Sequence, residues 1–537
     1  MSAPLLEVES LTVHAGRNQI LDHVSFSLDG SSRTGIIGES GSGKTMTALA
    51  ILGLLPDGLR ADGSVRMGGE ELLHQSERQL ALRRGNSMSM IFQEPMTALN
   101  PLMRIGRQIA EPLRIHRGMA RSEAVDVAVQ LLSDVGVHQP ERRVRSFPHE
   151  RSGGQRQRAM IAMALACGPD LVIADEPTTA LDVTVQARVL DVLRRQVVAN
   201  DAALILITHD LPVVASIADE VIVLHDGAVV EMGATKEVFR SPQDDYTRRL
   251  VSSVPPMSRS FEIPTKADTP RTDGRTIVQI REVTKLYKLR RRRLAESPST
   301  IRAVDEVSFD VRVGETLGIV GESGSGKSTL ARLMMGLEMP TSGLVTLNGV
   351  ELVDKAAVEE TRGVAQMVFQ DPNGSLDPRM LVKDVVAEPL RALKIGGDHG
   401  ARVAELLDAV SLPADSADRY PHEFSGGQRQ RIAIARALAP SPSLLIADEA
   451  VTALDMSVQT ITLELLDQLK RDFEFTMVFI SHDLSVVHEV SDRVVVLENG
   501  RNVEMGPVGE VFTNPEQAYT RDLLASIPRL DGSFIGT

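Results

Sequence analysis

The sequence has no tryptophan, one cysteine and only four tyrosines, and aromatic residues make up 3% of its 537 positions. Apolar residues still reach 42%, so we expect globular cores built mainly from aliphatic side chains. A single cysteine, Cys167, excludes an internal disulfide and any zinc or iron–sulfur site built from cysteines. Its small apolar neighbours favour a buried structural residue over a reactive thiol.

Two further absences narrow the class of protein. No apolar run approaches the roughly 18–20 residues that a membrane-spanning helix needs. The first residues also lack the basic and then apolar pattern of a secretory signal. The net charge of −14 argues against a nucleic-acid partner, because such proteins present a basic face. We therefore expect a cytoplasmic chain that can dock on a membrane protein.

The chain is an internal repeat. The segment GESGSGKT at residues 38–45 returns as GESGSGKS at 321–328, and SGGQRQR at 152–158 returns at 425–431. The number of residues between the two copies of a motif is the same for all later motifs and is larger for the glycine-rich segment. Insertions or deletions therefore lie between the first two motifs of each half. A repeat unit as long as a domain indicates a duplication, not a solenoid.

The boundary between the copies follows from composition. Residues 255–276 contain four prolines and many small polar residues, which is typical of a flexible linker. We divide the chain into a first domain at 1–254, this linker, and a second domain at 277–537. A basic stretch at 288–293 favours a solvated surface loop over a patch for anionic lipid headgroups.

Each glycine-rich segment has the context of a phosphate loop. A short apolar stretch precedes it, and a helix-like run follows at residues 46–55 or 329–337. Glycines let backbone amides surround phosphates at the positive end of a helix. Two copies with matching motifs downstream disfavour a plain glycine turn. The lysines expected to reach the β- and γ-phosphates are Lys44 and Lys327, and the hydroxyls offered to Mg²⁺ are those of Thr45 and Ser328.

An acidic pair follows an apolar run in both copies. The runs at residues 171–174 and 444–447 are typical of buried parallel strands, whose carboxyl edge is where ligands bind. The first acid of each pair can hold Mg²⁺, and the second can activate the attacking water. The predicted metal ligands are Asp175 and Asp448, and the predicted bases are Glu176 and Glu449.

A second anion site is predicted where Ser152 and two glycines open a helix-like stretch at residues 156–166, because a serine cap and exposed amides suit an anion. With the phosphate loops and acidic pairs, this motif resembles ATP-binding-cassette (ABC) ATPases across nearly the whole chain. The resemblance implies an α/β fold with two tandem P-loop nucleotide-binding domains. Each would have a RecA-like core, an antiparallel β subdomain and a helical subdomain.

In that family the serine–glycine motif of one domain closes over ATP held by the other, so the resemblance implies a pseudo-dimer within one chain that uses ATP and Mg²⁺. One implied site joins Gly38, Ser40, Gly41, Ser42, Gly43, Lys44 and Thr45 to Ser425, Gly426, Gly427 and Gln428. The other joins Gly321, Ser323, Gly324, Ser325, Gly326, Lys327 and Ser328 to Ser152, Gly153, Gly154 and Gln155. Further implied residues are the catalytic and metal-facing Gln93 and Gln370, the dimer-facing Asp182 and Asp455, and the γ-phosphate switches His209 and His482.

The resemblance narrows at residues 93–101 and 370–378 and at the tails that close each half, residues 241–250 and 514–521. These segments are similar to the paired ATPases of dipeptide, oligopeptide and nickel importers. The resemblance implies an ATP hydrolase that powers import of peptides or similar solutes. It would lie on the cytoplasmic face of two membrane permeases. An external binding protein would choose the solute. The tails have two interpretations. A segment that packs on the domain surface through tyrosine and leucine is at least as well supported as a direct role in substrate handling.

Three other functions stay open at this point. An ABC exporter ATPase is opposed only by the importer-like segments. A soluble tandem ATPase acting on ribosomes would need a long charged helical linker, whereas residues 255–276 are broken by prolines. A DNA-repair ATPase would need zinc modules and basic surface.

Three departures from the family pattern suggest that the two sites are unequal. Arg151 stands where the family usually has leucine and the second half has Phe424. Ala15 occupies the place of an aromatic residue that stacks on adenine, a role the second half can give to Tyr287. Ala450 follows the second acidic pair, where the first half has proline.

Overall fold

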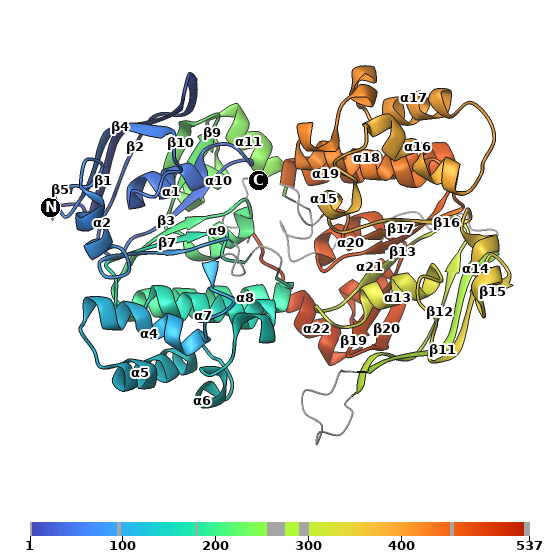
Figure 1. Cartoon of the computed structure of the whole chain (residues 1–537), viewed down its shortest axis with the longest axis horizontal. Coiled ribbons are helices and arrows are strands. Elements are labelled where there is room, and N and C mark those ends of the chain that lie inside the picture. Colours follow the sequence, from blue (N-terminus) through green and yellow to red (C-terminus); the bar gives the residue numbers. More distant parts are fainter. Residues whose placement is uncertain are drawn as a thin grey trace.

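The computed structural model describes residues 3–93, 98–178, 181–254, 274–288, 300–451 and 456–530. The chain folds into two halves that lie side by side and repeat the same order of elements (Figure 1). The first half runs from blue to green and the second from yellow-green to red. The predicted linker lies outside the described residues up to 273, and strand β11 begins at Thr276, just before the predicted start of the second domain.

Two sheets form the first half. An antiparallel sheet has the order β2-β1-β4-β5, and a second sheet has the order β10-β9-β3-β8-β7-β6, parallel except for β10. The strands are β1 (Leu6–Ala15), β2 (Asn18–Leu28), β3 (Arg33–Ile37), β4 (Leu59–Met67), β5 (Glu70–Glu71), β6 (Met88–Ile91), β7 (Leu171–Asp175), β8 (Ala203–Ile207), β9 (Glu220–His225) and β10 (Ala228–Ala234).

The helices of the first half cover the parallel sheet and build a separate helical layer from α4, α5 and α7, which pack on one another. The helices are α1 (Lys44–Leu52), α2 (Glu77–Arg83), α4 (Ile105–His116), α5 (Arg121–Asp134), α6 (Pro140–Arg143), α7 (Gly153–Ala164), α8 (Val183–Ala199), α9 (Leu211–Ile217), α10 (Thr235–Arg240) and α11 (Asp245–Ser252).

The second half repeats this plan with sheets β12-β11-β14-β15 and β16-β17-β18-β13-β19-β20. Its strands are β11 (Thr276–Lys288), β12 (Thr300–Arg312), β13 (Thr316–Val320), β14 (Ser342–Leu347), β15 (Val350–Glu351), β16 (Ala365–Val368), β17 (Leu444–Asp448), β18 (Thr476–Ile480), β19 (Arg493–Glu498) and β20 (Arg501–Pro507). Its helices are α13 (Lys327–Met334), α14 (Lys355–Thr361), α15 (Pro372–Ser375), α16 (Val382–Ala392), α17 (His399–Ala409), α18 (Gly426–Leu438), α19 (Met456–Phe473), α20 (Leu484–Val490), α21 (Val508–Thr513) and α22 (Ala518–Ala525).

The apolar patterns account for these elements. Strand β2 alternates buried and exposed residues, which suits a sheet with one covered face. Strands β7 and β17 are buried along their whole length, as their continuous apolar runs predict. The cores are mainly aliphatic, with a few fully buried phenylalanines, and Cys167 is buried as expected.

The helices after the phosphate loops begin earlier than predicted. Their first residues are Lys44 and Lys327, because Gly43 and Gly326 take positive φ angles of 101° and 107° and end the loop there. Helix α7 likewise begins at Gly153 instead of residue 156. Among the described residues, no helix combines the length and apolarity needed to cross a bilayer.

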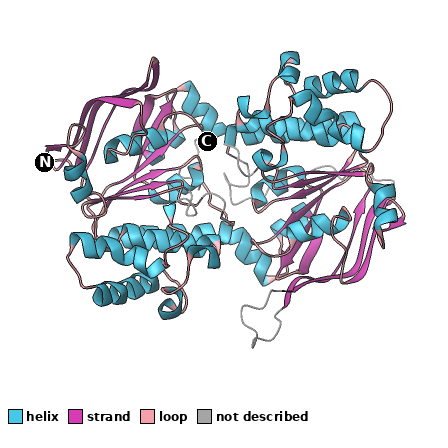
Figure 2. Ribbon diagram, in the orientation of Figure 1, coloured by secondary structure: helices cyan, strands magenta, loops and turns pink. Residues whose placement is uncertain are grey.

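Helices from both halves meet along the boundary between them (Figure 2). Helix α22 of the second half contacts α8 of the first. Val183, at the start of α8, packs in the main core of the second half, whereas Leu530 belongs to an apolar cluster of the first half. The two halves therefore share apolar contacts besides their covalent connection.

Candidate nucleotide sites

Both glycine-rich loops are bent into anion-binding conformations. In the first, Gly38 has a φ of 151° and a Cβ there would lie 2.2 Å from the carbonyl oxygen of Leu224, so only glycine fits. The Lys44 Nζ donates to the carbonyl oxygens of Gly38 and Glu39, each at 2.7 Å. Lys327 makes the same pair of bonds in the second half, at 2.7 and 3.1 Å. Each lysine thus lies over its own loop.

The acidic residue that ends β7 is buried beside the first loop. Burial raises the pKa of Asp175 to about 6, and the Thr45 hydroxyl opposes that shift by hydrogen bonding to the carboxylate. Its Oδ1 has no hydrogen-bond partner among the described residues. In the second half, the Ser328 Oγ donates to Asp448 Oδ1 over 3.3 Å. A buried carboxylate with an open oxygen next to a hydroxyl fits a hard divalent cation such as Mg²⁺.

The predicted base of the first half, Glu176, is held by two residues distant in sequence. The Gln93 Nε2 donates to its Oε2 over 2.7 Å, and the His209 Nδ1 lies 3.1 Å from its Oε1. The φ of Glu176 is 44°, a left-handed conformation that costs a non-glycine residue of order 1 kcal/mol. This backbone turns the carboxylate toward the glutamine and the histidine.

The second half builds the same cluster. The Gln370 Nε2 donates to Glu449 Oε2 over 2.5 Å, and the His482 Nδ1 lies 3.5 Å from Glu449 Oε1. Burial alone would raise the pKa of Glu449, but His482 and Lys327 together hold that pKa below its ordinary value. Burial opposes protonation of His482, yet its bond to Glu449 raises the pKa of the ring. The contact between the two side chains therefore favours the charged form of each.

Residues from both halves line the second site. A cavity of about 400 Å³ is bounded by Asp182 of the first half and by Lys327, Ser328, Gln370, Glu449 and His482 of the second. The Ser323 amide donates to the carboxylate of Asp182, and the Thr184 hydroxyl donates to Glu322 Oε1. Asp182, expected to face the opposite half, therefore lies against the second phosphate loop.

Comparison with known proteins agrees with this geometry. The family model described as "ABC transporter" matches residues 21–179 and 304–452. The model described as "Oligopeptide/dipeptide transporter, C-terminal region" matches residues 230–276 and 503–534. The chain belongs to the ABC transporter family.

Named relatives cover the chain from end to end. The Glutathione import ATP-binding protein of Escherichia coli (strain K12) is 44% identical over 98% of this chain and 89% of its own length. The protein of the same name from Shigella dysenteriae serotype 1 (strain Sd197) is 43% identical over the same shares. A dimeric ATP-binding cassette bound to ADP and Pi aligns with 43% of this chain and 98% of its own, at 31% identity and a TM-score of 0.39.

The serine–glycine motifs of this ABC protein do not line the described cavity. Residues 152–155 lie outside its lining, although they belong to the half that supplies Asp182. Ser425 and Gln428 instead bond to each other, with Gln428 Oε1 accepting from the Ser425 amide over 3.1 Å. Asp455 lies outside the described residues. The pairing of each motif with the opposite loop stays a prediction.

The departures from the ABC pattern have local structural counterparts. The Arg419 guanidinium lies 4.4 Å above the ring of Phe424, whereas the first half has Ser146 and Arg151 at those two places. The first half therefore lacks an arginine at the place of Arg419 and has one at the place of Phe424. The hydroxyl of Tyr287 donates to Glu338 Oε2 over 2.6 Å, and Ile301 lines the cavity. Stacking of Tyr287 on adenine stays a prediction.

Sequence reasoning missed residues that touch the phosphate loops from outside the motifs. Tyr246 and Tyr519 accept hydrogen bonds from the loops, and Thr184 reaches Glu322 from the opposite half. The recurrence of a tyrosine in both tails was the available signal, but nothing local in the sequence says that a tail returns to a loop at the other end of its domain.

Proposed function

We propose that this chain is the ATP-hydrolysing subunit that powers import of peptides or similar small solutes. The observation that supports ATP hydrolysis is a cluster that occurs twice in the chain. In each half a glutamine and a histidine contact the same glutamate beside a phosphate loop. The tails that match the oligopeptide and dipeptide transporter region favour an importer over an exporter. The full-length relatives named for glutathione import make short peptides the cargo class to test first.

In the proposed reaction Glu176 and Glu449 orient and polarise the water that attacks the γ-phosphate. Their partner glutamines hold one carboxylate oxygen, and the histidines hold the other, which fixes the direction of the carboxylate. Bound Mg²⁺ would neutralise phosphate charge. The residues that would hold it are Thr45, Gln93 and Asp175 in the first half and Ser328, Gln370 and Asp448 in the second.

The proposed cycle uses the two halves as one unit. ATP binding would draw residues 425–428 over the loop of Lys44 and residues 152–155 over the loop of Lys327, and hydrolysis would release them. Asp182 already lies against the opposite loop in the structure, so the closing movement would start from halves in contact. Residues 152–155 would be the part that moves toward the nucleotide.

The proposed partners are two membrane permeases and an external substrate-binding protein, with the chain held peripherally on the cytoplasmic face. A groove of about 710 Å³ in the second half lies between the sheet core and the helical layer and suits a permease helix. Its lining includes Phe369 and Leu337, which are exposed to 41% and 58%. Phe369 directly precedes Gln370, so a helix seated there could move the glutamine that holds Glu449.

The mechanism is tested by Glu176→Gln combined with Glu449→Gln. Because amides cannot accept the proton of the attacking water, we expect bound ATP and a loss of turnover of about 100-fold or more. The matched control combines Glu123→Gln with Glu464→Gln, two exposed glutamates away from the site, and should leave turnover unchanged. Normal turnover in the first double variant would refute the proposed role.

The direction of transport separates an importer from an exporter. The chain would be reconstituted with its permeases and binding protein in vesicles that carry ATP on the side of the chain, and uptake of labelled glutathione and short peptides would be followed. Accumulation on the ATP side supports the proposal. ATP-dependent movement away from that side would favour an exporter.

A further inference from the structure

The tail of each half returns to its own phosphate loop. The Glu39 amide donates to the Tyr246 hydroxyl over 2.8 Å, and the Glu322 amide donates to the Tyr519 hydroxyl over 3.1 Å. The tyrosines are the second residues of helices α11 and α22, far from the loops in sequence. The same contact thus occurs twice, at equivalent places of the two copies.

The tyrosine is held firmly at both places. Glu231 of β10 accepts from the amides of Gln243 and Asp244, at 2.9 and 3.1 Å, and so fixes the chain just before α11. Glu504 does the same before α22. The ring of Tyr246 is 5% exposed and stacks on His225 with centroids 3.9 Å apart. The main chain is therefore held before both tyrosines, and the ring of Tyr246 is held as well.

The bonded peptide unit is one that the loop lysine also holds. The Lys44 Nζ bonds to the carbonyl oxygens of Gly38 and Glu39, and the tyrosine bonds to the amide of Glu39. When the lysine turns toward phosphate, it must give up at least one of its two hydrogen bonds to these carbonyl oxygens. The tyrosine hydroxyl would then remain as an anchor of the loop, because it approaches from the tail and not from the nucleotide.

At the second site the same residue also meets the opposite half. The Glu322 carboxylate accepts from the Thr184 hydroxyl while its amide donates to Tyr519. Burial raises the pKa of Tyr519 to about 12, so its hydroxyl stays neutral at physiological pH. Tail, loop and opposite half therefore converge on one residue.

We propose that Tyr246 and Tyr519 are positioning residues that keep each phosphate loop in its ATP-binding conformation. The inference rests on the proposed function, in which these loops hold ATP. Loss of one hydroxyl removes a single neutral hydrogen bond, which corresponds to about a two- to tenfold change in an equilibrium constant. We expect the effect on ATP binding and not on the chemical step, because each tyrosine bonds to the main-chain amide of a loop residue.

The test uses the full chain with Tyr246→Phe, Tyr519→Phe and both together. Phenylalanine keeps the ring packing and removes only the hydroxyl. We expect the KM for ATP, and the Kd of a non-hydrolysable ATP analogue, to rise about two- to tenfold in the double variant, with kcat and Tm little changed. Tyr420→Phe, at a 41% exposed tyrosine of the second half, is the matched control.

A KM and Kd equal to those of the control would overturn the inference, and so would a lower Tm without a change in either constant, since that marks a packing role only. If Tyr246→Phe does not fold, Tyr519→Phe alone decides, because its ring is less buried. Lys44→Ala and Lys327→Ala separate this failure from failure of the proposed function. Normal turnover in both lysine variants would refute ATP use at the loops, whereas strong loss there with unaffected tyrosine variants would refute only the inference.

Discussion

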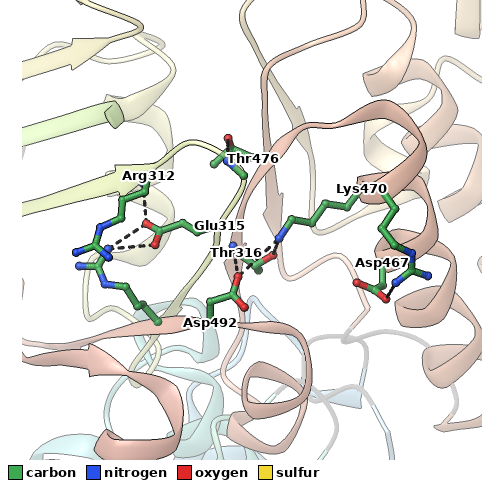
Figure 3. A network of polar contacts seen from close by, with 10 residues as sticks. Arg312, Glu315, Thr316, Asp467, Lys470, Thr476 and Asp492 are labelled. Carbon is green, nitrogen blue, oxygen red and sulfur yellow. Dashed lines mark hydrogen bonds and ion pairs between the residues drawn. The ribbon is translucent and has the colours of Figure 1, made fainter. Parts of the chain in front are cut away.

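The two halves share a fold and a set of site contacts, yet they differ at the base of the central sheet. In the second half, the 2%-exposed side chain of Glu315 pairs with Arg493 over 3.0 Å and accepts from the Arg312 amide (Figure 3). Beside it, Asp492 accepts from the Thr316 amide, and Lys470 donates to the Thr316 hydroxyl.

The equivalent place in the first half has a simpler arrangement. Arg33, which stands at the position of Thr316, pairs with Asp219 over 2.7 Å in a largely solvated environment. The glutamate and lysine of the second half are replaced by Ser32 and Val197. Contacts to the glutamates and to the phosphate loops are thus repeated in both halves, whereas the polar contacts at the base of the sheet are not. Duplicated function constrains the site more tightly than its support.

The largest expected difference concerns the loop lysines. Lys44→Ala and Lys327→Ala should each lower ATP turnover by about 100-fold or more, since each removes a cation from developing phosphate charge. We expect unequal losses, because the loop of Lys327 is predicted to face the motif preceded by Arg151. Steady-state ATPase rates measure both, and Arg151→Phe should bring them closer. Equal losses before that change would argue against asymmetry.

A smaller difference is expected in stability. Arg493→Ala leaves the buried Glu315 without its cation and should lower the free energy of unfolding of the second half by about 3 kcal/mol. Arg33→Ala breaks a solvated pair and should cost less than about 1 kcal/mol. Hydrogen exchange on peptides from each half, followed in urea, assigns the change to its half. Equal costs would contradict the contrast between the two supports.

The smallest expected difference depends on pH. Hydrogen bonds from Arg501 and Arg302 hold the pKa of Asp305 below its ordinary value. Its stabilising contribution is therefore present above the ordinary carboxyl pKa and is lost as the pH falls through the lowered one. At the equivalent place, Asp22 accepts instead from the side-chain amide of Gln19.

Asp305→Asn should therefore lower the Tm slightly at pH 7 and less at pH 3. Asp22→Asn is the matched control and should lower the Tm by less at pH 7, because no arginine pairs with that carboxylate among the described contacts. Calorimetric or dye-based melting of both variants at the two pH values measures this. A Tm loss for Asp305→Asn that is larger at pH 3 would contradict the sign of the effect.

Much of the site could be predicted because its residues lie in short motifs with fixed local geometry. The runs before Asp175 and Asp448 predicted buried strands, and strand direction then predicted the sheet edge that carries the glutamates. The glutamines that meet them there, Gln93 and Gln370, were implied by the family resemblance. The first residues of the helices were predicted less accurately. The glycines at positive φ end the loop and also cap the helix, so the helix begins directly after them.

Contacts set by tertiary structure alone could not be predicted. The bond from Glu39 to Tyr246 joins the two ends of a domain, and the pair of Glu315 and Arg493 joins the start of one strand to another near the chain end. Neither has a local pattern, since any position facing the same gap could supply the partner. In the proposed cycle, the place of residues 152–155 would depend on how far the halves close, which no single half of the sequence encodes.

In the proposed cycle the two halves act as one unit and not as two independent ATPases. The most direct test compares the steady-state ATPase rates of Glu176→Gln and Glu449→Gln, each alone, with the rate of the unmodified chain. Independent sites would leave two residual rates that add up to the unmodified rate, however unequal the sites are. We predict that the two residual rates add up to far less. A sum equal to the unmodified rate would show that the two sites hydrolyse ATP independently and would contradict joint action of the halves.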